Sequence, residues 1–284
     1  MRFHATLRKR ASRLLVICAV IYLITGLGCA SFQRKMIYFP PVFTTEQVEE
    51  LARAEKLERW KSADGERLGW KRPSPTQPAR GQILIAHGNA CCAFQCGHYA
   101  DVIQQVAPFD VFLLEYPGYP DCPGSPKETV LYEAARKGFE ALPTNAPVYV
   151  IGESLGTGVA AYLGGLYSNA VAGLTLLAPY TRLADVGQAH VRIFPVRWIL
   201  SEKFPAEDYL RNYHGPVAVL LGGHDAVVPA RLGRRLYDGY AGYKKVWEFE
   251  ELSHETLMSQ PAQVWREIVH FWEEDSLKIG AWTP

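Results

Sequence analysis

Ser154 carries the chemistry that the sequence suggests most strongly. It is the centre of the pentapeptide Gly-Glu-Ser-Leu-Gly at 152–156, between an apolar run at 148–151 and a small-residue stretch at 157–161. A G-x-S-x-G pattern between a strand and a helix places the serine on a strained corner with its hydroxyl exposed. The flanking glycines relieve the crowding where the strand and the helix almost touch. We therefore interpret Ser154 as a nucleophile.

A serine hydroxyl needs a base to take its proton, and the base needs an acid to fix its tautomer. Asp225 follows the apolar run at 217–221, and His254 follows the next run at 246–249. Carboxylates at the carboxyl ends of strands point into the crevice where ligands bind in open α/β sheets. We predict Asp225 as the acid and His254 as the base. Asp185, which follows the preceding strand, is the second choice for the acid.

The oxyanion that forms during acyl transfer needs backbone N–H donors aimed at the developing charge. The N–H of Leu155, directly after the nucleophile, is the first predicted donor. The second is expected from the loop His-Gly-Asn-Ala at 87–90, which follows the apolar run at 83–86. We predict that Asn89 supplies it through its main chain.

Alternation of apolar runs with helical stretches predicts an α/β fold. Such a repeat of strand, helix and strand gives a mostly parallel sheet covered by helices on both faces. An irregular insertion at about 179–215 is expected to form a short cap over the site. Strands are predicted at 57–61, 67–72, 83–86, 111–114, 148–151, 174–177, 217–221 and 246–249, and helices at 46–56, 94–106, 128–142, 154–167, 230–240 and 261–274.

The first 31 residues are typical of an export signal or a membrane anchor. An apolar stretch at 14–24 follows five cations, and no acidic residue occurs before Glu46. The positive-inside rule then keeps the N-terminus cytoplasmic and exports the hydrolase domain at 32–284. Three fates of the leader stay open: lipidation of Cys29, an uncleaved anchor, or plain signal cleavage. The five cations are Arg2, Arg8, Lys9, Arg10 and Arg13.

Composition excludes some other classes of function. The formal net charge of +1 provides no extended basic face for nucleic acid. The chain has no C-x-x-C pair and no H-E-x-x-H motif, so a metal site has little support. The predicted chemistry requires no metal ion and no organic cofactor.

Taken together, the motifs resemble the lid-poor, serine aminopeptidase-like branch of the α/β-hydrolase superfamily, including its membrane-anchored bud-emergence-type members. The resemblance implies the same nucleophile, acid and base as the spacing argument. The motifs that carry it span nearly the whole chain after the leader: 33–40, Asp64-Gly65, 87–90, Tyr-Pro-Gly-Tyr at 116–119, 152–156, Asp225 with Val228-Pro229, and His254.

Two loops depart from the pattern of that branch. Cys91 and Cys92 stand where a glycine usually follows the 87–90 motif, and the loop at 116–124 is richer in proline and contains Cys122. Both loops flank the pocket in that fold, so substrate preference does not carry over. In an oxidising compartment we expect a disulfide from Cys122 to Cys91, Cys92 or Cys96; small buried thiols are the alternative.

The function predicted from these residues is a serine hydrolase that cleaves a carboxylic ester or thioester of modest size through an acyl-enzyme. A serine peptidase is the alternative within the same chemistry. A non-catalytic binding protein that has kept the fold is the alternative from another class, and it is disfavoured because all three triad positions are occupied.

Overall fold

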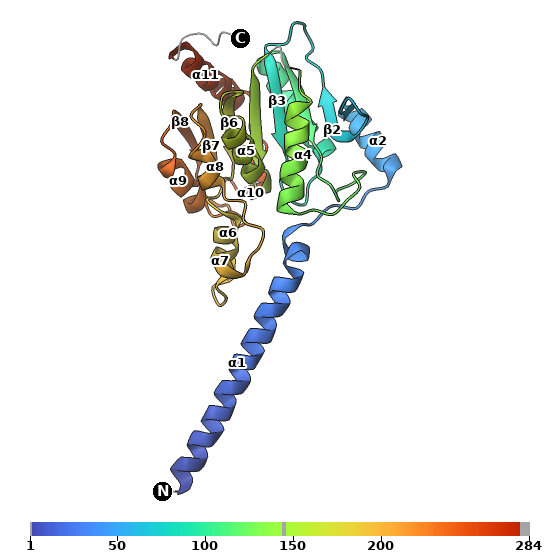
Figure 1. Ribbon diagram of the computed structural model, residues 1–284. Coiled ribbons are helices and arrows are strands. Elements are labelled where there is room, and N and C mark those ends of the chain that lie inside the picture. Colours follow the sequence, from blue (N-terminus) through green and yellow to red (C-terminus); the bar gives the residue numbers. More distant parts are fainter. Residues whose placement is uncertain (1, 144–145, 279–284) are drawn as a thin grey trace.

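Eight strands form one sheet in the order β1-β2-β4-β3-β5-β6-β7-β8 (Figure 1). The structure is a computed structural model and describes residues 2–143 and 146–278. The strands are β1 (Glu58–Lys61), β2 (Arg67–Arg72), β3 (Gly81–Ala86), β4 (Phe109–Leu114), β5 (Val148–Glu153), β6 (Val171–Leu177), β7 (Val217–Gly222) and β8 (Lys244–Phe249).

The predicted fold class is confirmed. β1 and β2 pair antiparallel, as do β2 and β4, whereas the strands from β4 to β8 run parallel. Every residue of β3, β5 and β7 is buried, because helices cover both faces of a parallel sheet and neither face meets water. All predicted strands are present, and most extend one to three residues beyond the apolar runs.

Helices pack on both faces of this sheet. α4 and α5 lie against β2 to β6 on one face, where α9 also packs on β7, and α3 contacts α11 on the other. The small residues at 156–161 let α5 lie close to β5, and all of them are buried. The helices of the domain are α2 (Thr45–Ala54), the 3-10 turn η1 (Ala93–Cys96), α3 (Gly97–Val106), α4 (Glu128–Glu140), α5 (Leu155–Leu166), α9 (Ala230–Gly239), α10 (His254–Leu257) and α11 (Ala262–Lys278).

The insertion between β6 and β7 forms a small cap of three short helices. They are α6 (Leu183–His190), α7 (Val196–Ile199) and α8 (Ala206–Leu210). In Figure 1, α6 and α7 lie beyond the end of the sheet where α10 also lies, and α8 packs on α5. The cap therefore adjoins the carboxyl ends of the parallel strands.

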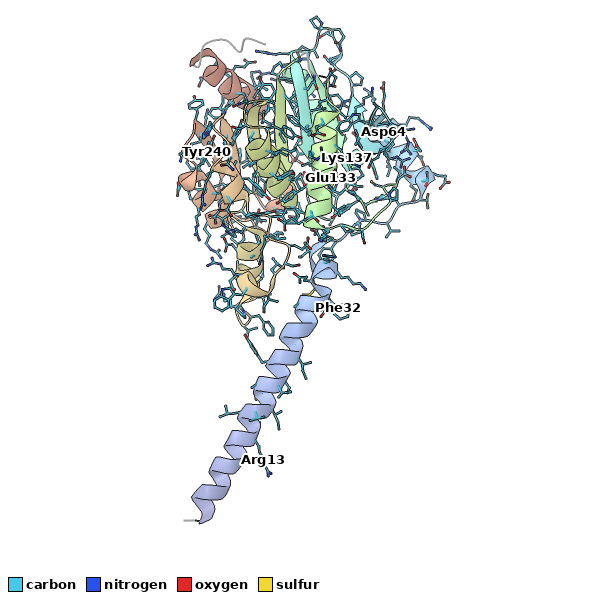
Figure 2. The ribbon with its side chains drawn as sticks, viewed as in Figure 1. Arg13, Phe32, Asp64, Glu133, Lys137 and Tyr240 are labelled. Atoms are coloured by element: carbon cyan, nitrogen blue, oxygen red, sulfur yellow. The ribbon has the colours of Figure 1, made fainter. Side chains whose placement is uncertain are left out.

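The N-terminal helix α1 (Arg2–Ile37) projects away from this same end of the domain (Figure 1). Arg13 and Phe32 lie along it outside the body of the domain (Figure 2). The helix runs through the predicted boundary between the leader and the domain at residue 31 and ends at Ile37. Among the described residues no single helix passes as a membrane span by length and apolarity, but Arg13–Gly26 together with Ala30–Ile37, bent by 47°, does so as a pair.

Candidate active site

Ser154 lies at the sharp turn from β5 into α5. Its backbone has φ 50° and ψ −114°, a strained conformation for a residue other than glycine. The Ser154 N–H donates to the Leu177 carbonyl at 2.9 Å, which fixes the turn against β6. A Cβ placed on Gly156 would lie 2.0 Å from the Ala86 carbonyl oxygen, so only glycine allows this approach to β3. The corner expected from the sequence pattern is therefore present.

Asp225 and His254 contact each other directly. His254 Nδ1 lies 2.7 Å from Asp225 Oδ2. The other carboxylate oxygen of Asp225 accepts the N–H groups of Val227 and Val228 at 2.8 and 2.7 Å. These bonds hold the buried carboxylate, and the proton on Nδ1 leaves Nε2 of His254 as an acceptor.

Within the described residues, Ser154 Oγ forms no hydrogen bond with His254. The His254 ring has one hydrogen-bond partner in that part of the chain, which is Asp225. The three predicted residues follow the carboxyl ends of β5, β7 and β8, which share one edge of the sheet. Hydrogen bonds between catalytic groups are often long in unliganded enzymes and shorten in the substrate complex.

The loop after β3 passes close to Ser154. A Cβ on Gly88 would lie 3.4 Å from the Ser154 Cβ and 2.7 Å from Glu153 Oε1, so a side chain here would displace the Glu153 carboxylate. Neither the Asn89 N–H nor the Leu155 N–H donates a hydrogen bond within the part of the chain described. The assignment of these two N–H groups as oxyanion donors stays a prediction.

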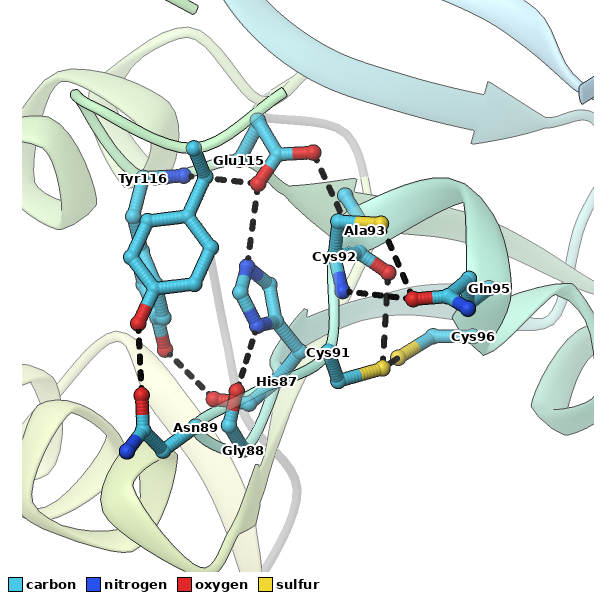
Figure 3. A network of polar contacts seen from close by, with 11 residues as sticks. His87, Gly88, Asn89, Cys91, Cys92, Ala93, Gln95, Cys96, Glu115 and Tyr116 are labelled. Carbon is cyan, nitrogen blue, oxygen red and sulfur yellow. Dashed lines mark hydrogen bonds and ion pairs between the residues drawn. The ribbon is translucent and has the colours of Figure 1, made fainter. Parts of the chain in front are cut away.

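The loop at 87–93 is held from the end of β4 (Figure 3). The Glu115 carboxylate accepts the N–H groups of Ala93 and Tyr116, at 3.0 and 3.1 Å, and contacts His87 Nε2 at 3.1 Å. The Tyr116 hydroxyl donates to the His87 carbonyl at 2.9 Å. Sequence reasoning missed Glu115, although its place directly after an apolar run is the same signal that identified Asp225.

His87 and Glu115 form a buried ion pair. His87 Nδ1 lies 2.7 Å from the Gly88 carbonyl, and Nε2 faces the carboxylate. Both partners are acceptors, so the imidazole needs a proton on each nitrogen. Burial opposes that charge, but the hydrogen bond and the charge of Glu115 outweigh burial and raise the pKa of His87 above its ordinary value. The pair fixes the loop beside Ser154.

Replacing Glu115 with glutamine should lower the free energy of unfolding by about 3–5 kcal/mol, because it leaves a buried imidazole without its counter-charge. A raised pKa of His87 means that the pair stabilises the protein at low pH. The difference in the free energy of unfolding between the variant and the wild type should therefore shrink as the pH rises through that pKa. Urea unfolding of detergent-solubilised protein at several pH values measures both effects.

Glu133→Gln is the matched control, since Glu133 is an exposed carboxylate that pairs with Arg136. Its cost should stay below about 1 kcal/mol. If both variants lost the same free energy of unfolding, or if the loss in Glu115→Gln grew with pH, the His87–Glu115 pair would not stabilise the loop.

The Asn89 side chain has a role that the sequence did not reveal. Its Oδ1 accepts the Phe39 N–H at 3.0 Å and the Tyr119 hydroxyl at 2.9 Å, and its Nδ2 donates to the Ile37 carbonyl. The residue whose main chain we predicted as a donor is thus tied to the end of α1. No local pattern could have shown this, because the partners lie 30 to 52 residues away.

Asp185, the second choice for the acid, forms hydrogen bonds within the cap. Its Oδ2 accepts the Thr181 hydroxyl at 2.5 Å, and its Oδ1 accepts Arg197 Nε at 2.6 Å. Both partners belong to the cap insertion. This buried carboxylate therefore braces the cap.

The expected disulfide from Cys122 is wrong. Cys122, Cys91, Cys92 and Cys96 are all free. The preceding residue, Asp121, pairs with Arg59 and Arg67, which draws its loop toward β1 and β2. The sulfur atoms in contact are instead those of Cys91 and Cys96, 3.9 Å apart, and this contact lowers the pKa of Cys91.

Relatives of the chain were found by sequence, although no protein-family model matches it. The uncharacterized protein Rv2307c of Mycobacterium tuberculosis is 33% identical over 248 residues, which cover 84% of this chain and 86% of that protein. The lysophosphatidylserine lipase ABHD12 of Xenopus tropicalis is 29% identical over 203 residues, covering 63% of this chain and 51% of the lipase.

Solved structures share the fold at low sequence identity. The Pyrococcus furiosus esterase PF2001 gives a TM-score of 0.62 at 14% identity, covering 84% of this chain and 98% of the esterase. Est1E of Butyrivibrio proteoclasticus gives 0.63 at 14% identity, covering 78% of this chain and all of the other. With the sheet order and the relatives by sequence, these matches show that the chain belongs to the α/β-hydrolase superfamily, in one family with the mycobacterial protein.

Proposed function

We propose that the protein is a membrane-anchored serine hydrolase that cleaves carboxylic esters or thioesters through an acyl-enzyme on Ser154. The observation that carries the proposal is the 2.7 Å contact between His254 Nδ1 and Asp225 Oδ2, at the sheet edge where Ser154 occupies a strained turn. An aspartate that holds Nδ1–H directs the basic Nε2 toward a nucleophile. The proposed chemistry uses protein groups and water.

In the proposed mechanism His254 takes the proton of Ser154 as the hydroxyl attacks the acyl carbon. The N–H groups of Leu155 and Asn89 then bind the oxyanion of the tetrahedral intermediate. His254 returns the proton to the leaving alcohol or thiol, which leaves the acyl group on Ser154. Water, deprotonated by His254, releases the carboxylic acid and regenerates the serine.

Ester cleavage ranks above peptide cleavage because an alcohol or thiol is a better leaving group than an amine. The names of the similar proteins agree, since they include an esterase and a lysophosphatidylserine lipase. The short cap, with helices of eight, four and five residues, fits the lid-poor branch that the motifs resemble. Serine peptidase activity is the competing proposal.

A panel of substrates that share one acyl group separates these two reactions. We expect kcat/KM for aryl and alkyl esters and for thioesters to exceed that for the matching anilide by about a hundredfold or more, a difference of roughly 3 kcal/mol in activation free energy. Comparable turnover of the anilide, or faster release of N-terminal amino acids from peptides, would favour the peptidase. Esters of graded acyl length in the same panel define the size of the acyl pocket.

Membrane attachment through α1 is part of the proposal. The apolar stretch at 14–24 lies in the projecting helix, and its side chains from Leu14 to Ile17 are exposed. The cations that precede the stretch would remain cytoplasmic, and the domain from residue 32 onward would be exported. An uncleaved anchor and a lipid on Cys29 would both keep the domain at the membrane.

A further inference from the structure

The cap is fastened to α1 at two separate levels. Near the domain, the buried carboxylate of Glu202 accepts Arg34 Nε at 2.9 Å and the Tyr38 hydroxyl at 2.6 Å. Farther along the helix, the Tyr22 hydroxyl donates to the Ile193 carbonyl at 3.0 Å. From Tyr22 to Arg34 the helix rises about 18 Å, so the cap follows it over about a third of its length (Figure 1).

The far contact places the loop between α6 and α7 beside the apolar part of α1. The Phe194 ring stacks on Tyr22 with centroids 4.8 Å apart, and a Cβ on Gly26 would lie 3.7 Å from that ring. Tyr22 stands two residues before the end of the apolar stretch at Ile24, which is about 3 Å along the helix. The loop therefore reaches the level at which the apolar stretch ends.

The side chains at this end of the cap are apolar and exposed. Trp198 is 88% exposed and Ile193 is 71% exposed, although both are large hydrophobic residues. Ile193 lies beside Tyr22 of α1, and in Figure 2 side chains of the cap extend toward the helix below Phe32. The exposed apolar residues of that helix are Leu14, Leu15, Val16, Ile17, Val20, Ile21 and Ile24.

The charges of the cap end favour a lipid surface. The segment 186–201 contains no aspartate or glutamate but includes Arg192 and Arg197. Arg192 is exposed, and Arg197 pairs with Asp185. An apolar surface with a tryptophan and flanking cations suits the boundary between acyl chains and anionic headgroups.

We infer that the end of the cap, formed by Ile193, Phe194 and Trp198, inserts into the surface of the bilayer that α1 anchors in, and that anionic phospholipid is its ligand. The inference rests on the proposed membrane attachment through α1. Because the cap adjoins the sheet edge that carries Ser154 and His254, this contact turns the candidate site toward the membrane. The helix alone could not fix that orientation, since it could tilt in the bilayer.

Quenching of Trp198 fluorescence tests the inference on the full chain reconstituted in phosphatidylcholine and phosphatidylglycerol vesicles. The Trp198→Phe variant serves as the blank, so the difference between the two proteins reports Trp198 alone. We expect brominated phospholipid to reduce this difference signal about twofold, as for an aromatic residue at the interface, and aqueous acrylamide to have little effect. Vesicles without phosphatidylglycerol should give weaker quenching by brominated lipid.

Quenching by acrylamide without quenching by brominated lipid would overturn the inference, because Trp198 would then face water. Protection from both quenchers would also overturn it, since a protein surface would then cover the residue. Hydrolysis of a short, water-soluble ester by the same vesicles tests the proposed activity separately. Retention of the protein in the membrane after alkaline extraction tests the α1 anchor, so a failure of each of the three claims can be told apart.

Discussion

Replacing Ser154 with alanine should lower kcat for ester hydrolysis by about a millionfold, as removal of the nucleophile does in other triad enzymes. The reason is structural: Ser154 occupies the strained turn between β5 and α5, beside the loop that presents the Asn89 N–H. Alanine can adopt the same backbone and deletes only the oxygen atom. Initial rates with a soluble aryl ester measure the effect.

Two controls accompany that variant. Its unfolding midpoint should stay near that of the wild type, which shows that the domain is still folded. Ser62→Ala, in the turn between β1 and β2, should keep full activity because its hydroxyl bonds only within that turn. Undiminished hydrolysis by pure Ser154→Ala protein would mean that another residue is the nucleophile.

The second large effect is expected at Asp225. Asparagine at this position would offer an N–H to His254 Nδ1 and favour the tautomer in which Nε2 carries the proton. The base would then be blocked, and kcat should fall by about ten-thousandfold. KM should change much less, because the carboxylate contacts the imidazole and two backbone N–H groups.

Asp185→Asn is the matched comparison, since it makes the same chemical change in a buried carboxylate of the cap. It weakens the contacts with Arg197 and Thr181, so a loss of stability is expected, with kcat within about tenfold of wild type. If Asp185→Asn were the crippling change and Asp225→Asn were mild, the assignment of the acid would be wrong.

The parts of the fold that could be predicted depend on local patterns. Apolar runs locate β3 to β7 because strands buried on both faces must be continuously hydrophobic, whereas β8 is an edge strand with no buried residue. Ser154, Asp225 and His254 could be proposed because each follows such a run, and the carboxyl ends of parallel strands meet at one edge. The positive φ of Ser154 is the strained turn that the flanking glycines predict.

The remaining features depend on contacts between distant segments. The hydrogen bonds from Asn89 to Ile37 and from Arg34 to Glu202 join residues that no sequence periodicity relates. The disulfide prediction failed: Cys122 is free, and the ion pairs of Asp121 hold its loop against Arg59 and Arg67. Glu115 is a different case. It directly follows a buried strand, as the predicted triad residues do, so the same pattern could have identified it.

The central claim, that Ser154 is an activated nucleophile, is tested most directly by labelling with a fluorophosphonate probe and locating the adduct by peptide mass spectrometry. The probe reacts with a serine whose hydroxyl is activated by a neighbouring base. We expect one adduct, on Ser154, that is absent from Ser154→Ala and strongly reduced in Asp225→Asn. An adduct on another serine, or no labelling of folded wild-type protein, would contradict it.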